Sequence, residues 1–157
     1  MRKRIITDSP LKTASTEDDW LNIEDLADVE ITSENIDYPI EFALLPGRST
    51  GWRAAAPGKQ TIRLVFPRPQ QLRRIWIQFR ETSIDRTQEF VLRWSPDRGQ
   101  TFHEIVRQQW NFSSPTATSE EENYLVEIFA ATILELNIVP DISGGNAIAS
   151  LAQLRLA

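Results

Sequence analysis

The chain has 157 residues, of which 41% are hydrophobic and 25% charged, and its formal net charge at pH 7 is −5. These values are ordinary for one globular domain, and the negative charge argues against a nonspecific grip on nucleic acid. Because the sequence contains no cysteine, disulfide frameworks, thiolate zinc sites and cysteine nucleophiles are all excluded.

The first residues are polar and show no periodicity. Residues 1–17 are rich in Ser, Thr and Lys, so we expect a flexible tail. Ile5 and Ile6 are followed by polar residues where a signal peptide needs a continuous apolar run, and no stretch reaches the ~20 apolar residues that cross a bilayer. We therefore expect a cytoplasmic protein without a membrane segment.

A short helix is predicted after this tail, over residues 18–27. Asp18 and Asp19 can cap it, and the apolar residues that follow have helical spacing. From Val29 onward the apolar runs are short, alternate with period two and end in turn residues, which is typical of strands. The predicted strands cover residues 29–33, 60–66, 72–81, 88–94, 101–112, 122–129, 132–139 and 148–156.

Eight strands without a long helix between them predict an all-β fold, a two-sheet antiparallel jelly-roll sandwich with a short N-terminal helix. Residues 18–157 would form this single domain, with the jelly roll over 29–157. Pro and Gly residues break the segment 33–59, which we expect to be a long connection of the kind that often carries function. Trp52 within it is expected to anchor the connection in the core.

Basic residues are concentrated in the middle of the chain. Residues 61–112 carry 9 basic and 5 acidic side chains and lie between two acidic flanks. On an antiparallel sheet such arginines usually lie on exposed faces and pair with carboxylates of neighbouring strands. We expect this arrangement for Arg63, Arg73, Arg74, Arg80, Arg93 and Arg107. The acidic run 120–122 is expected at a solvated loop edge.

Motifs of catalytic sites occur only in part. Gly47-Arg48-Ser49-Thr50-Gly51 matches the G-x-S-x-G nucleophile elbow, but the strand before it and the helix after it are not predicted. His103 is the only histidine, and its neighbour Glu104 would point to the opposite face of a strand, so the two cannot share a metal ion. We therefore expect no enzymatic activity, no metal and no other cofactor.

Two aromatic residues are candidates for ligand contact. Trp76 is out of phase with the core-facing Ile75 and Ile77, so it could stack on a sugar or a base, or be covered by the N-terminal segment. Trp110 and Asn111 precede a loop rich in Ser and Thr, and they combine an apolar face with amide hydrogen bonding, as carbohydrate sites do. A buried, structural Trp110 is the alternative.

Several short motifs resemble those of a known family. They are Ile31-Thr32-Ser33-Glu34, Gly51-Trp52-Arg53-Ala54, Gln60-Thr61-Ile62-Arg63-Leu64, Phe90-Val91-Leu92-Arg93-Trp94-Ser95, Leu134-Glu135-Leu136 and the last strand through Leu154 and Leu156. Over residues 29–157 the chain resembles discoidin-like, galactose-binding-like jelly rolls, the family of coagulation factor type C domains and related carbohydrate-binding modules. The resemblance implies eight strands and a ligand site in the loops at one end. In this family the ligand is often a sugar and sometimes a lipid, a protein or a DNA-repair partner. Calcium-binding members use a glutamate in the last strand, where this chain has Gln153, so no calcium site is predicted.

Two hypotheses of function remain open. In the first, the chain is a non-catalytic carbohydrate-binding module whose end loops present Arg48, Arg86, Trp110 and Asn111 to a glycan. In the second, it is an intracellular interaction domain whose arginine-rich strands and Trp76 dock an acidic protein or, less in keeping with the net charge, a nucleic acid. A hydrolase is the third alternative.

Overall fold

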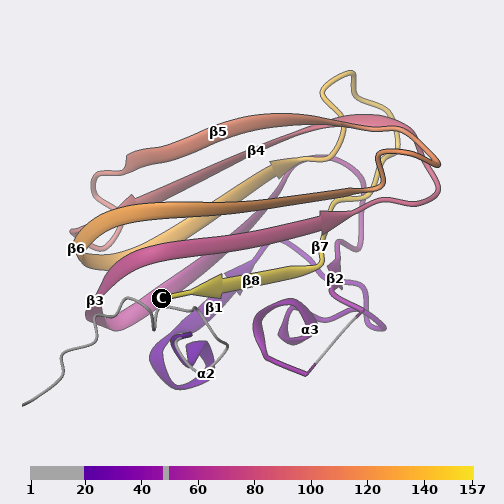
Figure 1. Ribbon diagram of the computed structural model, residues 1–157. Helices are drawn as coiled ribbons and strands as arrows, with labels where there is room; N and C mark the ends of the chain where they lie inside the picture. The colour runs from indigo at the N-terminus through magenta and orange to yellow at the C-terminus, as the bar shows by residue number, and fades with distance from the viewer. Residues whose placement is uncertain (1–19, 48–49) are drawn as a thin grey trace, which may run out of the picture.

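The structure is a computed structural model that describes residues 20–47 and 50–157. Its helices are α2 (Ile23–Leu26) and α3 (Glu41–Leu44). Its strands are β1 (Asp28–Ile31), β2 (Trp52–Arg53), β3 (Gln60–Arg80), β4 (Arg86–Ser95), β5 (His103–Phe112), β6 (Ser119–Val139), β7 (Ser150–Leu151) and β8 (Gln153–Leu156). Figure 1 shows the strands packed in layers, with both helices on one side of them.

Two strands of 21 residues each, β3 and β6, pass from one layer to the other. In what we call the first layer, their segments 60–65 and 133–138 pair within the order β1-β3-β6-β4-β5. In the second layer, segments 74–80 and 119–125 pair, and β8 adds to the free side of β3. All of these pairings are antiparallel, so the predicted two-sheet antiparallel jelly-roll sandwich is confirmed.

A change in side-chain phase marks the place where β3 crosses between the layers. Even-numbered residues such as Leu64 are buried before the crossing, whereas odd-numbered residues such as Ile77 are buried after it. The carbonyl oxygen of Ala157 accepts hydrogen bonds from both Arg73 N–H (2.6 Å) and Arg74 N–H (2.9 Å). Two residues of β3 therefore face one residue of their partner, which is a β-bulge and shifts the alternation by one residue.

The predicted strands 60–66 and 72–81 are thus one strand, and so are 122–129 and 132–139. Pro67 and Pro69 do not end β3, because they lie between the paired residues Val65 and Gln70, where no ladder N–H is needed. The predicted strand 148–156 is instead two short strands, β7 and β8.

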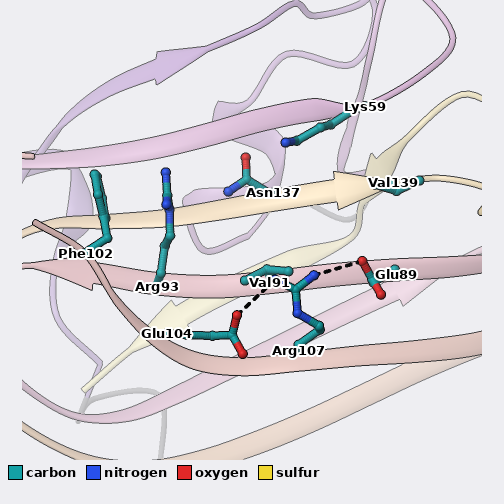
Figure 2. A pocket seen from close by; sticks show the side chains of 9 residues that line it. All are labelled: Lys59, Glu89, Val91, Arg93, Phe102, Glu104, Arg107, Asn137 and Val139. Atoms are coloured by element: carbon teal, nitrogen blue, oxygen red, sulfur yellow. Dashed lines mark hydrogen bonds and ion pairs between the residues drawn. The ribbon is translucent and has the colours of Figure 1, made fainter.

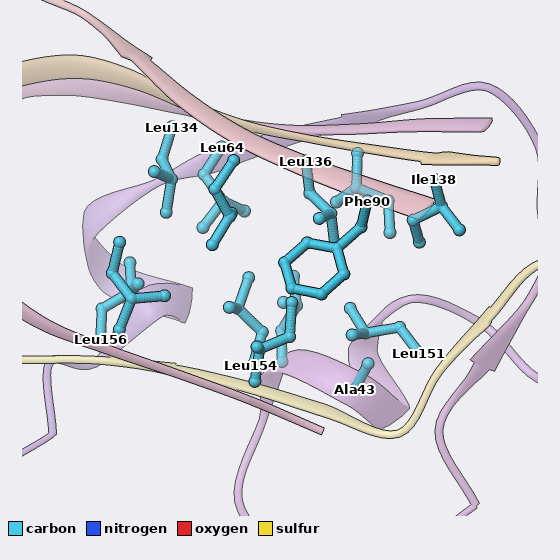
Figure 3. Packing of buried hydrophobic residues seen from close by; sticks show 14 of the residues in the cluster. Ala43, Leu64, Phe90, Leu134, Leu136, Ile138, Leu151, Leu154 and Leu156 are labelled. Atoms are coloured by element: carbon cyan, nitrogen blue, oxygen red, sulfur yellow. The ribbon is translucent and has the colours of Figure 1, made fainter. Parts of the chain in front are cut away.

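The core lies between the two layers and extends under α3. Phe79 of the second layer meets Phe90 of the first, with ring centroids 5.0 Å apart. Figure 3 shows Phe90 among aliphatic side chains of both layers, with Ala43 of α3 at the edge of the cluster. Trp52 is fully buried and its indole N–H donates to the carbonyl of Ser33 (3.0 Å), so its predicted role as a core anchor is confirmed.

The connection 33–59 contains more regular structure than predicted, namely α3 and β2, and β2 pairs with β7. The helix predicted over 18–27 is a single turn, because Ala27 is already extended and leads directly into β1. Residues 18 and 19 and the predicted tail 1–17 lie outside the described residues. No helix in the described part of the chain has the length and apolar character needed to cross a bilayer.

Gly51 should tolerate no side chain, because it combines a positive φ of +75° with a close backbone neighbour. A Cβ there would lie 2.6 Å from the carbonyl oxygen of Leu151. Gly58 has φ +94° but no atom within 4 Å of a built Cβ, so Gly58→Ala is the matched control for backbone strain. We expect Gly51→Ala to lower the free energy of unfolding by about 2 kcal/mol more than Gly58→Ala in thermal denaturation. Equal losses would contradict the steric argument.

Candidate functional site

Four connections gather at one end of the sandwich, which we call the loop end. Because β3 and β6 fold over at the opposite end, both termini of each strand return to the same side. The connections 81–85, 113–118 and 140–149 therefore lie there, as do both ends of the connection between β1 and β3. Figure 1 shows the β3–β4, β5–β6 and β6–β7 connections at the end of the sandwich where β2 and β7 lie. Loops carried by a rigid pair of sheets are the usual place for binding residues.

A groove of about 380 Å³, the loop-end groove, opens among β2, β7 and the β3–β4 connection. The guanidinium of Arg53 lies 4.7 Å from the centre of the Tyr38 ring, and Ile84 is 52% exposed. Hydroxyl groups complete the lining, from Thr50, Thr82, Ser83 and Ser150. Apolar faces beside a few converging hydrogen-bonding groups are typical of small-molecule sites.

The backbone holds the Arg53 side of this groove in place. Arg53 pairs with Ser150 of β7, and its N–H donates to the carbonyl of Tyr38 (3.2 Å). Because neighbours in a strand point to opposite sides, burial of Trp52 turns Arg53 outward, where it is exposed. The arginine is thus anchored through its buried neighbour.

The opposite wall is held by Glu81. Its carboxylate accepts hydrogen bonds from Ser83 N–H (3.2 Å) and the Ser83 hydroxyl (3.1 Å), and it pairs with Arg86 at 2.8 Å. Burial alone would raise the pKa of Glu81, but hydrogen bonds from Ser83 and the nearby charge of Arg86 outweigh it and lower the pKa. These bonds hold residues 81–83 in one conformation at this wall of the groove.

A second hollow, of about 310 Å³, lies on the outer face of the first layer (Figure 2). Charged residues alternate in register across all five strands of this face, in the order Glu30, Arg63, Glu135, Arg93 and Glu104. Arg63 lies 2.6 Å from Glu135 and 3.2 Å from Glu30, and Arg93 lies 2.5 Å from Glu135. We call this set the charge row.

Arg107 continues the pairing beside the charge row, at 3.1 Å from Glu89 and 3.0 Å from Glu104. The predicted pairing of strand arginines with carboxylates is thus confirmed for Arg63, Arg93 and Arg107. Their charge is balanced within the face, which leaves little net positive potential for an acidic partner.

Arg86, Trp110 and Asn111 lie on the paired segments of β4 and β5 near the loop end, but they do not face one common surface. Arg86 is buried, and besides Glu81 it reaches the carbonyl of Pro140 (2.6 Å), so its guanidinium joins two connections rather than facing solvent. This burial disagrees with the expectation that Arg86 is presented to a glycan. Arg48 lies outside the described residues.

Trp110 and Asn111 point to opposite sides of β5. Trp110 is half-buried and packs against the core, whereas Asn111 is exposed and its Oδ1 accepts a hydrogen bond from the Thr87 hydroxyl (2.5 Å). The pair therefore does not form the combined site expected from its sequence, because strand neighbours alternate between the two faces.

Trp76 lies on the outer face of the second layer, away from the loop-end groove. Trp20 stacks against it with ring centroids 6.5 Å apart, and the Trp76 indole N–H donates to Glu121 (2.8 Å). Arg74 lies 4.5 Å from the Trp20 ring centre. Trp20, from the segment before α2, thus covers part of Trp76, which was one of the two alternatives.

Ser49 of the nucleophile-elbow motif lies outside the described residues. His103 begins β5 at the end of the sandwich opposite the loop end, and its ring packs against Trp94 with centroids 5.0 Å apart. Gln153 donates to the Gln78 side chain (3.4 Å). Within residues 20–47 and 50–157 no three His, Cys, Asp or Glu side chains are grouped as a metal site.

The acidic run 120–122 is not at a loop edge, contrary to expectation. It belongs to β6, and Glu120 is only 1% exposed because it pairs with the core-facing Phe79. Gln108 of β5 donates to Glu122 (2.6 Å), and the Tyr124 hydroxyl donates to Gln108 (2.8 Å). These bonds join the free edges of the two layers.

Glu120, two residues before Glu122 in β6, has no such partner among the described residues. Both carboxyl oxygens of Glu120 are enclosed without a hydrogen-bond partner in the described structure, as are Trp110 Nε1, Gln88 Nε2 and Arg86 Nη2. Burial, with a smaller contribution from Glu122, raises the pKa of Glu120 to about 7. In the sequence alone, a run of three glutamates indicates a solvated segment. The burial of Glu120 follows only from its pairing with the buried Phe79.

Sequence comparison finds no relative, since no family model and no curated protein matches the chain. Solved structures share its fold. A family 32 carbohydrate-binding module of NanJ from Clostridium perfringens, in complex with galactose, has a TM-score of 0.60 at 15% identity. The match covers 83% of this chain and 92% of that one.

Two further structures show the same fold. CpGH89CBM32-5 from Clostridium perfringens, in complex with GalNAc-β-1,3-galactose, has a TM-score of 0.60 at 20% identity, over 83% of this chain and 94% of its own. XRCC1 in its reduced form, bound to the DNA polymerase β catalytic domain, has a TM-score of 0.60 at 13% identity, over 84% and 95%. The expected resemblance to galactose-binding-like jelly rolls is thus confirmed for the fold.

Proposed function

We propose that this chain is a non-catalytic binding module that holds a carbohydrate in the loop-end groove. The observation that carries the proposal is the composition of that groove. It brings an arginine stacked on a tyrosine ring, an exposed isoleucine and several hydroxyl groups to the end of a rigid sandwich.

Each part of the groove suits one aspect of a sugar. Sugar rings present apolar C–H faces and a rim of hydroxyl groups, so Tyr38 and Ile84 would pack against the faces. Arg53 would donate hydrogen bonds to ring hydroxyls, or charge-assisted ones to an acidic sugar. The held conformation of the 81–83 segment limits the entropy lost on binding.

The fold supports this proposal without specifying the ligand. Two of the structures that share it hold galactose or GalNAc-β-1,3-galactose. A jelly roll delivers its connecting loops to one end whatever the sequence of those loops, so ligand choice rests on the groove residues of this chain.

A glycan array with the purified protein tests the proposal, followed by calorimetric titration of the best ligand. We expect Arg53→Ala and Tyr38→Ala each to weaken binding by about tenfold, which corresponds to ~1.4 kcal/mol. Arg68→Ala is the matched control, because Arg68 is exposed at the opposite, folded-over end of β3. Absence of binding to every glycan, or equal loss in Arg68→Ala, would contradict the proposal.

Protein docking is a second candidate function, favoured by the outer face of the second layer. Leu125 and Phe129 of β6 are 82% and 77% exposed, and they lie on the same side as the stacked Trp20 and Trp76. XRCC1, with the same fold, was solved bound to another protein. The array separates the two functions, because a docking domain would give no glycan signal that depends on Arg53.

A further inference from the structure

The side of the sandwich built by residues 20–47 is acidic throughout. This stretch carries seven acidic residues, at positions 24, 25, 28, 30, 34, 37 and 41, and no basic residue. It forms α2 and α3, which in Figure 1 lie on one side of the strands, and β1, the edge strand of the first layer. Of the two arginines of the charge row, Arg63 pairs with Glu30 of β1 (3.2 Å) as well as with Glu135, whereas Arg93 pairs with Glu135.

Two adjoining hollows, of about 390 and 350 Å³, open on this acidic side and share Ile23, Leu44 and Leu45 as walls. The smaller one, which we call the edge groove, runs along β1. Its floor is apolar, and Glu24, Glu34 and Glu41 line it as well. An apolar groove with carboxylates around it is complementary to an apolar segment that carries positive charges.

The backbone of β1 borders the edge groove with an unpaired edge. β1 ends the first layer and pairs only with β3 among the described strands. Thr32 N–H donates to the carbonyl of Thr61 (3.0 Å), so Thr32 and Thr61 form a hydrogen-bonded pair at the end of the ladder between β1 and β3. Since bonded and non-bonded pairs alternate along an antiparallel ladder, the N–H and C=O groups of Val29 and Ile31 point away from β3.

The side chains of β1 alternate in the same way. Asp28 and Glu30 are exposed on the outer face, whereas Val29 and Ile31 are half-buried and line the edge groove. A strand added here would place every second side chain opposite a carboxylate and the others over the groove.

We propose that β1 binds an extended segment of a partner protein in which apolar residues alternate with Lys or Arg. The apolar residues cover Val29 and Ile31, and the main chain bonds to the free edge. The basic residues face Asp28 and Glu30, of which Glu30 also pairs with Arg63 (3.2 Å). A second copy of this chain is a poorer occupant, because its own β1 would bring like charges opposite one another. This site is separate from the loop-end groove and does not depend on the proposed carbohydrate function.

The test uses the full chain and a fluorescently labelled peptide, Lys-Val-Arg-Val-Lys-Val, whose binding is followed by anisotropy. We expect saturable binding that weakens with salt and slower amide hydrogen exchange at Val29 and Ile31. A peptide of the same composition in blocks, Lys-Lys-Arg-Val-Val-Val, should bind at least about fivefold more weakly, as should one with alternate amides methylated.

Asp28→Lys should weaken binding of the alternating peptide by about fivefold. Glu127→Lys makes the same change of charge on an exposed residue of β6 and should leave binding unaltered. Circular dichroism melting confirms that both variants fold. Equal binding of the alternating and block peptides, or equal loss in the two variants, would overturn the proposal. Binding of the alternating peptide only to a variant in which Arg2, Lys3 and Arg4 are replaced by Glu would also overturn the proposal. The N-terminal segment of this chain, and not a partner protein, would then be the occupant of the β1 edge.

Discussion

Replacing Glu135 by alanine is expected to lower the free energy of unfolding by about 3 kcal/mol at neutral pH. Glu135 is 1% exposed on a central strand and holds the guanidinium groups of both Arg63 and Arg93. Asn137 also donates to it, at 2.8 Å. Without the carboxylate, the guanidinium groups of Arg63 and Arg93 remain close together on the sheet and no longer have a negative charge between them. Chemical denaturation of the wild type and the variant measures the difference.

The matched control is Glu104→Ala, at the exposed end of the same charge row. Its pair with Arg107 is open to solvent, so its loss should cost less than about 1 kcal/mol. A loss in Glu135→Ala no larger than in Glu104→Ala would show that the charge row contributes nothing beyond ordinary surface pairs.

The difference in unfolding free energy between the wild type and Glu135→Ala should depend on pH. Burial by itself would raise the pKa of Glu135, but hydrogen bonds from Arg93, Arg63 and Asn137 outweigh it and lower the pKa below the usual 4.5. A carboxylate with a lowered pKa contributes stability above that usual value and loses it as the pH falls through the folded pKa. The gap between wild type and Glu135→Ala should therefore narrow in acid.

Replacing Glu120 by glutamine is expected to stabilise the protein above neutral pH, on the order of 2 kcal/mol. Glu120 keeps its proton in the folded chain up to a pKa of about 7, whereas its ordinary pKa is 4.5. The folded state thus binds more protons between these values, and wild-type stability falls as the pH rises through that window. Glutamine is similar in shape to the protonated acid, so the variant and the wild type should agree near pH 4.5.

Glu127→Gln is the control for this prediction, because Glu127 lies exposed on the same strand. Melting temperatures across the pH range provide the measurement. A constant difference between Glu120→Gln and wild type at every pH would contradict a buried, protonated Glu120.

The alternation of apolar residues was sufficient to predict which rows of side chains face the core. Phe90 and Leu92 are buried as their spacing indicated, and so are Ile75 and Ile77. Strand ends were harder to predict. Pro67 looked like the end of a strand, but a proline is tolerated where a bulged ladder needs no N–H, and only the pairing partner shows that.

The candidate site was less accessible to sequence reasoning. Arg86 is charged, and nothing in its neighbours along the chain shows that Glu81 and Pro140 enclose it. Tyr38 and Arg53 are 15 positions apart in a connection without periodicity, and they meet because the connection folds back so that Arg53 N–H donates to the carbonyl of Tyr38. The signal that could have indicated Arg53 was its position after Trp52, since a buried tryptophan turns the next strand residue outward.

The most direct measurement of the carbohydrate proposal is an NMR titration of backbone amides with the best ligand from the glycan array. Shifts that are confined to Thr50, Arg53, Ser83, Ile84 and Ser150 and saturate together are the predicted result. Saturable shifts centred on Trp76 and Leu125 of the second layer, with the loop end unchanged, would contradict it.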